Sequence, residues 1–188
     1  MDTKFYKIVR PVVKFLVKVL FRVEVVGIDN IPKDGGVVLA GNHTKWLDPV
    51  MLVGVCPRQV HFLAKDTLFK GIVGVIVKGM GAIPVNRRIH DKNALKEAEK
   101  RLNNNIVVGV FPEGTINRTK DIIMPFKIGA VKMSYDTSSK LVPFVITGKY
   151  KLFRKSIKIE FLRSRKISGD LTLENKKLED IISKKLEA

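Results

Sequence analysis

The chain has 188 residues, of which 45% are hydrophobic and 28% are charged. This composition is typical of one folded globular domain and not of a disordered protein. The single cysteine, Cys56, excludes an internal disulfide framework, and the lack of a CxxC motif or histidine cluster gives no support to a metal site. With 35 Lys+Arg against 18 Asp+Glu, the net charge is +17. Such a surface predicts a polyanionic partner: nucleic acid, an anionic membrane or a phosphorylated substrate.

Residues 1–22 are predicted to form an amphipathic helical segment. Its basic side chains recur every three or four positions and fall within an arc of roughly 120° beside a broad apolar face. These are Lys4, Lys7, Arg10, Lys14, Lys18 and Arg22. No charge-free run reaches the ~18 to 20 residues of a spanning helix, so the pattern predicts a helix in the plane of an anionic membrane. A helix that packs on the core is the alternative, and Pro11 is expected to kink the helix or start a second one.

The rest of the chain, residues 23–188, is predicted to be one domain in which strands alternate with helices. Strands are expected at 23–29, 36–41, 59–65, 82–87, 106–114, 141–148 and 155–163, and helices at 48–56, 91–105, 126–139 and 171–188. Residues 68–81 contain too many glycines to assign. The alternation predicts an α/β fold with a mixed sheet covered by helices. The last helix is expected to have an apolar face made of Leu173, Leu178, Ile181, Ile182 and Leu186.

Three loops follow predicted buried strands, where such a fold places its chemistry. The first contains His43 and, five residues later, Asp48. An aspartate bonded to one ring nitrogen fixes the tautomer, and the other nitrogen can then accept a proton from a substrate hydroxyl. Because there is no GxSxG motif and no well-placed nucleophilic cysteine, the attacking oxygen is expected to belong to the substrate. For this pair alone, the alternative is two residues that satisfy the backbone of a turn.

The other two loops add groups suited to a phosphorylated substrate. "VNRR" supplies Arg87 and Arg88, and arginine suits bidentate recognition of phosphate. "FPEG" supplies Glu113, followed by Gly114, at which a backbone can approach a ligand closely. Two further cations, Arg118 and Lys127, lie near this third loop in the sequence. Together the three loops predict a base with its orienting acid beside a phosphate-sized group of cations.

Four blocks between residues 42 and 146 carry a family resemblance: "NHTKWLD", "GAIPVNR", "FPEGT" and "LVPFVI", with "PFKIGA" beside them. In this order they resemble the glycerophospholipid acyltransferase family, most closely its 1-acyl-sn-glycerol-3-phosphate (lysophosphatidate) acyltransferases. The resemblance implies that His43 is the general base and Asp48 its partner. It implies that Arg87 binds the glycerol phosphate, assisted by Glu113 and Gly114 of the third block. We expect Thr115, Arg118 and Lys127 to bind substrate beside them. Pro143 is implied to lie in a strand that shapes the acyl site.

One departure from the family pattern falls in the third block. The family often continues this block with arginine and serine, whereas Ile116 and Asn117 follow Thr115 here. Because Ile116 cannot pair with a phosphate, Arg118 is expected to take over that contact.

The resemblance implies acyl transfer from acyl-CoA or acyl-carrier protein to the sn-2 hydroxyl of lysophosphatidate, which forms phosphatidate without a cofactor or a metal. The alternative acceptors are glycerol-3-phosphate or another lysophospholipid. A nucleic-acid-binding module is disfavoured because the N-terminal cations alternate with aliphatic residues and aromatic content is 7%. A catalytically silent membrane-binding relative is disfavoured by the intact His43 and Asp48. With no signal-peptide pattern, the expected location is the cytoplasmic face of the cell membrane, as a peripheral or monotopic protein.

Overall fold

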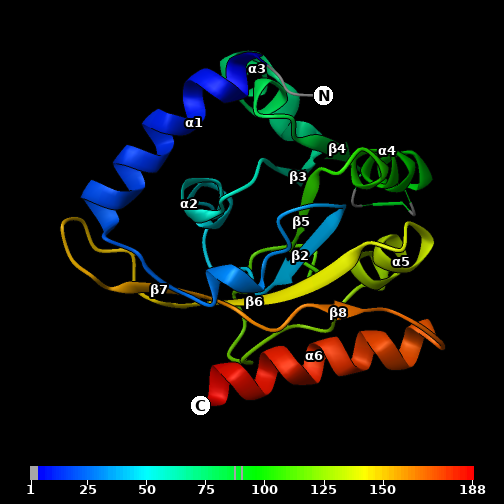
Figure 1. Ribbon diagram of the computed structural model, residues 1–188. Coiled ribbons are helices and arrows are strands. Elements are labelled where there is room, and N and C mark those ends of the chain that lie inside the picture. Colours follow the sequence, from blue (N-terminus) through cyan, green and yellow to red (C-terminus); the bar gives the residue numbers. More distant parts are fainter. Residues whose placement is uncertain (1–3, 87, 90) are drawn as a thin grey trace.

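The computed structural model describes residues 4–86, 88–89 and 91–188, and its strands form one mixed sheet (Figure 1). The strand order is β1-β7-β6-β2-β5-β3-β4, and β8 also pairs with β6. The strands are β1 (Glu24–Val26), β2 (Val37–Gly41), β3 (Val60–Lys65), β4 (Ile83–Val85), β5 (Val107–Val110), β6 (Lys140–Gly148), β7 (Ile157–Phe161) and β8 (Arg165–Lys166). β6, β2, β5, β3 and β4 are parallel to one another, whereas β7 and β8 are antiparallel to β6. The predicted mixed α/β fold is confirmed.

Helices cover both faces of this sheet. They are α1 (Lys4–Leu16), α2 (Asp48–Val55), α3 (Gly71–Gly79), α4 (Lys92–Asn103), α5 (Gly129–Asp136) and α6 (Leu171–Glu187), with the short turns η1 (Val17–Phe21), η2 (Ile28–Asn30) and η3 (Asp66–Phe69). Alternate residues of β2 point to opposite faces, as in any strand. Leu39 packs in a core with Met51 of α2, and Val38 packs in a second core with Leu178 of α6. Burial on both faces explains why the parallel strands read as continuous apolar runs.

Most predicted elements lie where the sequence pattern placed them, and the exceptions have local causes. The predicted strand 23–29 is cut short because Gly27 adopts a left-handed conformation (φ 69°), which starts η2. α5 begins later than residue 126 because the backbone N–H of Lys127 donates to the carbonyl oxygen of Pro112 (2.9 Å). In the unassigned stretch 68–81, Gly74 permits α3 to pack on η3, since a Cβ there would lie 2.3 Å from the backbone of Phe69. The last helix was expected to bury Leu173, but this side chain is 62% exposed.

The inner side of α1 packs on the domain. The helix continues through Pro11, so the chain forms one helix here and not two, and it ends in the π-helical turn η1. Tyr6 is buried, and its hydroxyl accepts a hydrogen bond from the backbone N–H of Val60 (3.0 Å). The half-buried Arg10 donates from Nη2 to the carbonyl oxygen of Cys56 (2.7 Å). Arg10 therefore faces inward, unlike the exposed Lys4, Lys7, Lys14, Lys18 and Arg22 of the predicted cationic stripe.

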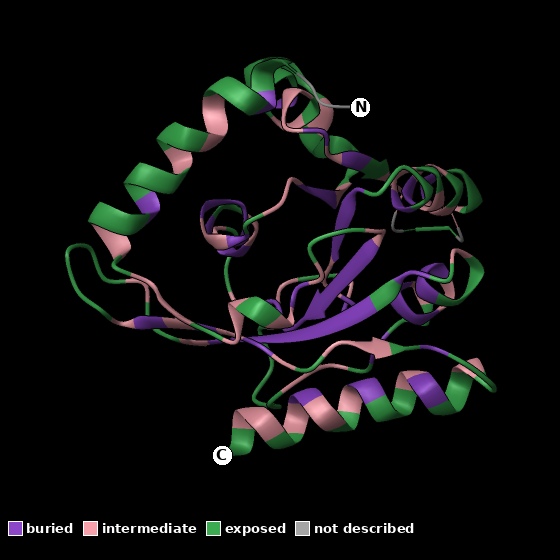
Figure 2. Cartoon of the chain, in the orientation of Figure 1, coloured by how far each residue is buried: buried purple, intermediate pink, exposed green. Residues whose placement is uncertain are grey.

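The outer side of α1 is apolar and exposed. Ile8 (72%), Val12 (55%) and Phe15 (64%) face away from the core, so green covers much of α1 in Figure 2. α3 lies against the first turn of α1, because a Cβ at Gly79 would lie 2.5 Å from the ring of Phe5. It too exposes apolar side chains: Ile72, Val73, Val75 and Ile76. No helix in the described part of the chain is long and apolar enough to cross a membrane.

Candidate active site

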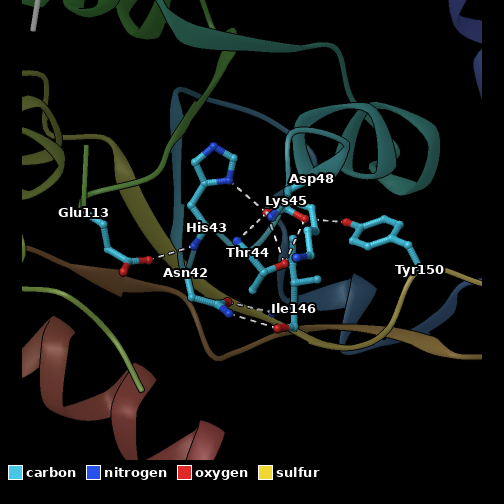
Figure 3. Close-up of polar contacts among 8 residues, drawn as sticks. All are labelled: Asn42, His43, Thr44, Lys45, Asp48, Glu113, Ile146 and Tyr150. Atoms are coloured by element: carbon cyan, nitrogen blue, oxygen red, sulfur yellow. Dashed lines mark hydrogen bonds and ion pairs between the residues drawn. The ribbon is translucent and has the colours of Figure 1, made fainter. Parts of the chain in front are cut away.

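The first and third motif loops lie together at the carboxyl edge of the sheet, where parallel strands end side by side. "NHTKWLD" follows β2, and "FPEGT" follows its neighbour β5. Asn42 fastens the first loop to β6: its side-chain amide donates to the carbonyl oxygen of Ile146 (2.9 Å), and its Oδ1 accepts from the N–H of Ile146 (2.8 Å). Figure 3 shows this reciprocal pair beneath His43. The end of β2 is thereby held at a defined place on the sheet.

His43 and Asp48 are in direct contact, as the sequence predicted for a tight turn. His43 Nδ1 lies 2.8 Å from Asp48 Oδ2, and the histidine is 7% exposed while the aspartate is fully buried. The imidazole ring stacks on the ring of Phe111, with 4.0 Å between the ring centroids. With Nδ1–H directed at the carboxylate, Nε2 is the nitrogen that carries the free lone pair. The geometry is that of a histidine oriented to act as a base.

The carboxylate of Asp48 is held by several donors. Its Oδ2 accepts from the backbone N–H groups of Thr44 (2.6 Å) and Lys45 (2.8 Å), and its Oδ1 accepts from the Tyr150 hydroxyl. Burial alone would raise the pKa of Asp48, but the hydrogen bonds from His43, the Lys45 backbone and Tyr150 outweigh it and hold the pKa below its usual value. Asp48 is therefore an anion at neutral pH, as an orienting partner of His43 must be.

Glu113 connects the two motif loops. Its Oε1 accepts from the backbone N–H of His43 (2.8 Å), and its Oε2 accepts from the backbone N–H of Met124 (2.9 Å). Burial raises the pKa of Glu113, although both hydrogen bonds act in the opposite sense. The structure thus gives Glu113 a positioning contact that the sequence did not predict. Its contact with substrate stays a prediction.

Of the side chains predicted to bind phosphate, the structure describes those of the third loop and not Arg87. Lys127 is exposed and crosses over Gly114, since a Cβ at Gly114 would lie 2.9 Å from Lys127 Nζ. Thr115 and Arg118 are exposed on the same loop. Arg87 lies outside the described residues, and its neighbour Arg88 is exposed. The third loop therefore offers polar and cationic side chains to solvent beside the His43–Asp48 pair.

Asn117, one of the two unusual residues of the third block, contacts the first loop through its backbone. The backbone N–H of Asn117 donates to the carbonyl oxygen of His43 (2.9 Å). The Asn117 side chain stabilises its own loop, accepting from the Thr119 backbone N–H (2.9 Å) and donating to the Asp121 carbonyl (3.0 Å). Asparagine at this position therefore has a structural use that is independent of any contact with phosphate.

Two residues at the site escaped the sequence analysis. Phe111 belongs to a recognised motif, but its stacking on His43 requires knowledge of how β2 and β5 pair. Tyr150 lies 102 residues beyond Asp48, in no motif, and no local pattern pointed to it. Among the described residues, no group of three His, Cys, Asp or Glu side chains is arranged to hold a metal ion. Burial raises the pKa of the Cys56 thiol to about 11, which makes it a poor nucleophile.

The chain is similar to known acyltransferases. A family model described as "Acyltransferase" matches residues 22–147. The 1-acyl-sn-glycerol-3-phosphate acyltransferase of Bacillus subtilis (strain 168) is 34% identical over 145 residues, which are 76% of this chain and 71% of that protein. The protein of the same name from Borreliella burgdorferi is 33% identical over 139 residues, which are 72% of this chain and 55% of that protein.

A solved structure shares the fold. The crystal structure of the 1-acyl-sn-glycerophosphate (LPA) acyltransferase PlsC from Thermotoga maritima matches with a TM-score of 0.76 and 22% sequence identity. The match covers 97% of this chain and 80% of that chain.

Proposed function

The chain belongs to the acyltransferase family, and we propose from this that it transfers an acyl group to the sn-2 hydroxyl of lysophosphatidate. The product would be phosphatidate, an intermediate of phospholipid biosynthesis. The acyl donor would be acyl-CoA or acyl-carrier protein, either of which suits a basic surface. The observation that carries the proposal is the buried contact of 2.8 Å between His43 Nδ1 and Asp48 Oδ2 at the carboxyl edge of the sheet.

The proposed reaction needs one base and no covalent enzyme intermediate. His43 Nε2 takes the proton from the acceptor hydroxyl while the hydroxyl oxygen attacks the thioester carbonyl carbon. The tetrahedral intermediate collapses: the new C–O ester bond remains, the C–S bond breaks, and the imidazolium returns its proton to the departing thiolate. Asp48 keeps the imidazole in the correct tautomer and stabilises its positive charge between the two transfers.

We propose that basic side chains in and near the second and third motif loops recognise the phosphate of the acceptor. Arg87, which follows Val85 by two positions in the sequence, is proposed to bind the glycerol phosphate by a bidentate contact. Lys127, Arg118 and Thr115 are exposed on the loop that follows β5 and would complete the site. The exposed position of Arg118 supports the proposal that Arg118 makes the phosphate contact that Ile116 cannot make.

We further propose that α1 and α3 seat the protein on an anionic membrane surface. Support comes from the outer face of α1, where exposed apolar side chains lie beside exposed lysines, and from the apolar surface of α3 next to it. Apolar side chains would enter the interfacial region while each cation near the surface contributes on the order of 1 kcal/mol. α1 would then hold the active site at the depth of the lysophospholipid hydroxyl. The protein would be peripheral and would lie on the cytoplasmic face of the membrane.

The proposed activity is tested by acyl transfer with purified protein. Acceptors should include lysophosphatidate, glycerol-3-phosphate and another lysophospholipid, each offered with acyl-CoA and with acyl-carrier protein. Turnover with lysophosphatidate is expected, and His43→Ala should lower it by roughly 10²- to 10⁴-fold, the contribution of a general base. Thr67→Ala, a change at an exposed site on η3, is the control and should leave both turnover and melting temperature unchanged.

A further inference from the structure

Tyr150 contacts the His43–Asp48 pair from a part of the chain that carries none of the motifs. Its hydroxyl donates to Asp48 Oδ1 (Figure 3). The other donors to Asp48 belong to residues 43–45: His43 Nδ1 and two backbone N–H groups contact Oδ2, and the Thr44 hydroxyl lies 3.2 Å from Oδ1. Tyr150 thus fixes the second carboxylate oxygen from outside the loop.

The segment that carries Tyr150 is fastened to the end of the N-terminal segment. Residues 149–156 connect β6 to β7, and the backbone N–H of Phe153 in this loop donates to the carbonyl oxygen of Leu20 (2.5 Å). The ring of Phe21 meets the ring of Tyr150 edge to face, with 5.9 Å between centroids and 80° between planes. The place of the Tyr150 hydroxyl therefore depends on the last turn of the N-terminal segment.

We propose that Tyr150 is a positioning residue for acyl transfer, which holds the Asp48 carboxylate in place and ties it to the N-terminal segment through Phe21. The inference rests on the proposed function. Without Tyr150, Asp48 Oδ1 would keep only the longer contact from the Thr44 hydroxyl (3.2 Å), so the carboxylate could rotate more freely and its hold on His43 Nδ1 would weaken. The Tyr150 hydroxyl adds a second donor at this oxygen, which restricts the rotation and keeps Nε2 directed at the acceptor hydroxyl.

Tyr150→Phe tests the inference, because it removes the hydroxyl and keeps the ring on Phe21. With a soluble short-chain acceptor, kcat should fall by roughly 10- to 100-fold, the usual effect of losing one hydrogen bond to a charged group. The KM values for both substrates should stay within about twofold, because Tyr150 contacts neither substrate in this scheme. Tyr135→Phe, at an exposed position of α5, is the matched control and should leave kcat unchanged.

Phe21→Leu tests the connection to the N-terminal segment. It leaves the Tyr150 hydroxyl in place and removes the ring contact, so kcat should fall by roughly two- to fivefold with KM unchanged. Unchanged kcat in Tyr150→Phe overturns the inference, and so does a loss of activity that only follows a loss of folded protein by circular dichroism. Unchanged kcat in Phe21→Leu would contradict the second part of the inference, that the contact between Phe21 and Tyr150 links the N-terminal segment to the active site. The proposed function is judged separately, since it fails only if the unmodified chain is inactive or His43→Ala retains full activity.

Discussion

His43 is held at three polar atoms by residues of two loops, its own and the one that follows β5. Its backbone N–H donates to Glu113, its carbonyl oxygen accepts from Asn117, and its Nδ1 contacts Asp48. The stacked ring of Phe111 restricts rotation of the imidazole further. A base held in this way loses little conformational freedom when substrate binds, which favours proton transfer over a short, fixed distance.

The lowered pKa of Asp48 has a consequence for stability. A carboxyl group whose pKa is lower in the folded than in the unfolded state stabilises the fold at pH values above its unfolded pKa of about 3.9. That contribution is lost as the pH falls through the folded-state value.

We therefore predict that Asp48→Asn lowers the free energy of unfolding, and that its difference from the unmodified protein is largest above about pH 5. The difference should shrink steadily below about pH 4, as measured by urea unfolding across this range. Asp29→Asn, an exposed change on η2, should stay within about 0.5 kcal/mol of the unmodified protein at neutral pH. A gap for Asp48→Asn that widens on acidification would contradict the prediction.

Arg87 and Arg88 are adjacent in the sequence and form a natural pair of test and control. Arg87→Ala should weaken apparent affinity for lysophosphatidate by one to two orders of magnitude, since a charge-assisted contact is worth about 1.5 to 3 kcal/mol. Arg87→Lys should recover only part, because a point charge lacks the planar fork of a guanidinium. Arg88→Ala should change acceptor affinity less than threefold. Acceptor and donor titrations measure both effects, and a collapse of donor affinity alone would refute the assignment of Arg87.

At the scale of elements, α1 packs on the core with one side and exposes on the other the apolar surface that we propose meets the membrane. Tyr6 of α1 and Val17 of η1 are buried in the core, whereas Ile8, Val12 and Phe15 of α1 are exposed on the opposite side. A test that deletes residues 1–20 would therefore also remove core side chains. Point substitutions on the outer face separate membrane contact from folding.

Ile8→Ser combined with Phe15→Ser should reduce cosedimentation with anionic vesicles, because each change removes exposed apolar surface from the proposed interface. Activity on soluble short-chain acceptors should be retained. Leu173→Ser, which alters an equally exposed leucine on α6, should leave vesicle binding intact. Undiminished vesicle binding by the variant that carries both Ile8→Ser and Phe15→Ser would place the membrane contact elsewhere.

A triple variant with glutamine in place of Lys7, Lys14 and Lys18 tests the cationic part of the proposed interface. It should lose more binding to anionic vesicles than to neutral ones, and added salt should reproduce that loss for the unmodified protein.

At the scale of the whole molecule, strand and helix positions followed from local patterns, but their junctions did not. The apolar run of β2 and the five-residue spacing of His43 and Asp48 are local features, so the fold class and this contact could be predicted. The truncation of β1 at Gly27 and the late start of α5 depend on backbone geometry that composition does not reveal. The contacts of Glu113 and Tyr150 with residues 43–48 depend on how β5 and β6 pair with β2, which no local pattern reveals.

The single thiol of the chain lies beneath the N-terminal helix. Cys56 is 2% exposed, and Arg10 donates to its carbonyl oxygen. An alkylating reagent requires access to the thiolate, and both access and ionisation are suppressed while α1 is closed over this site. The rate of alkylation would therefore report how often the helix opens, and lipid that seats the helix would slow the reaction. The Cys56 thiol is therefore a natural chemical probe of local unfolding at the helix that we propose meets the membrane.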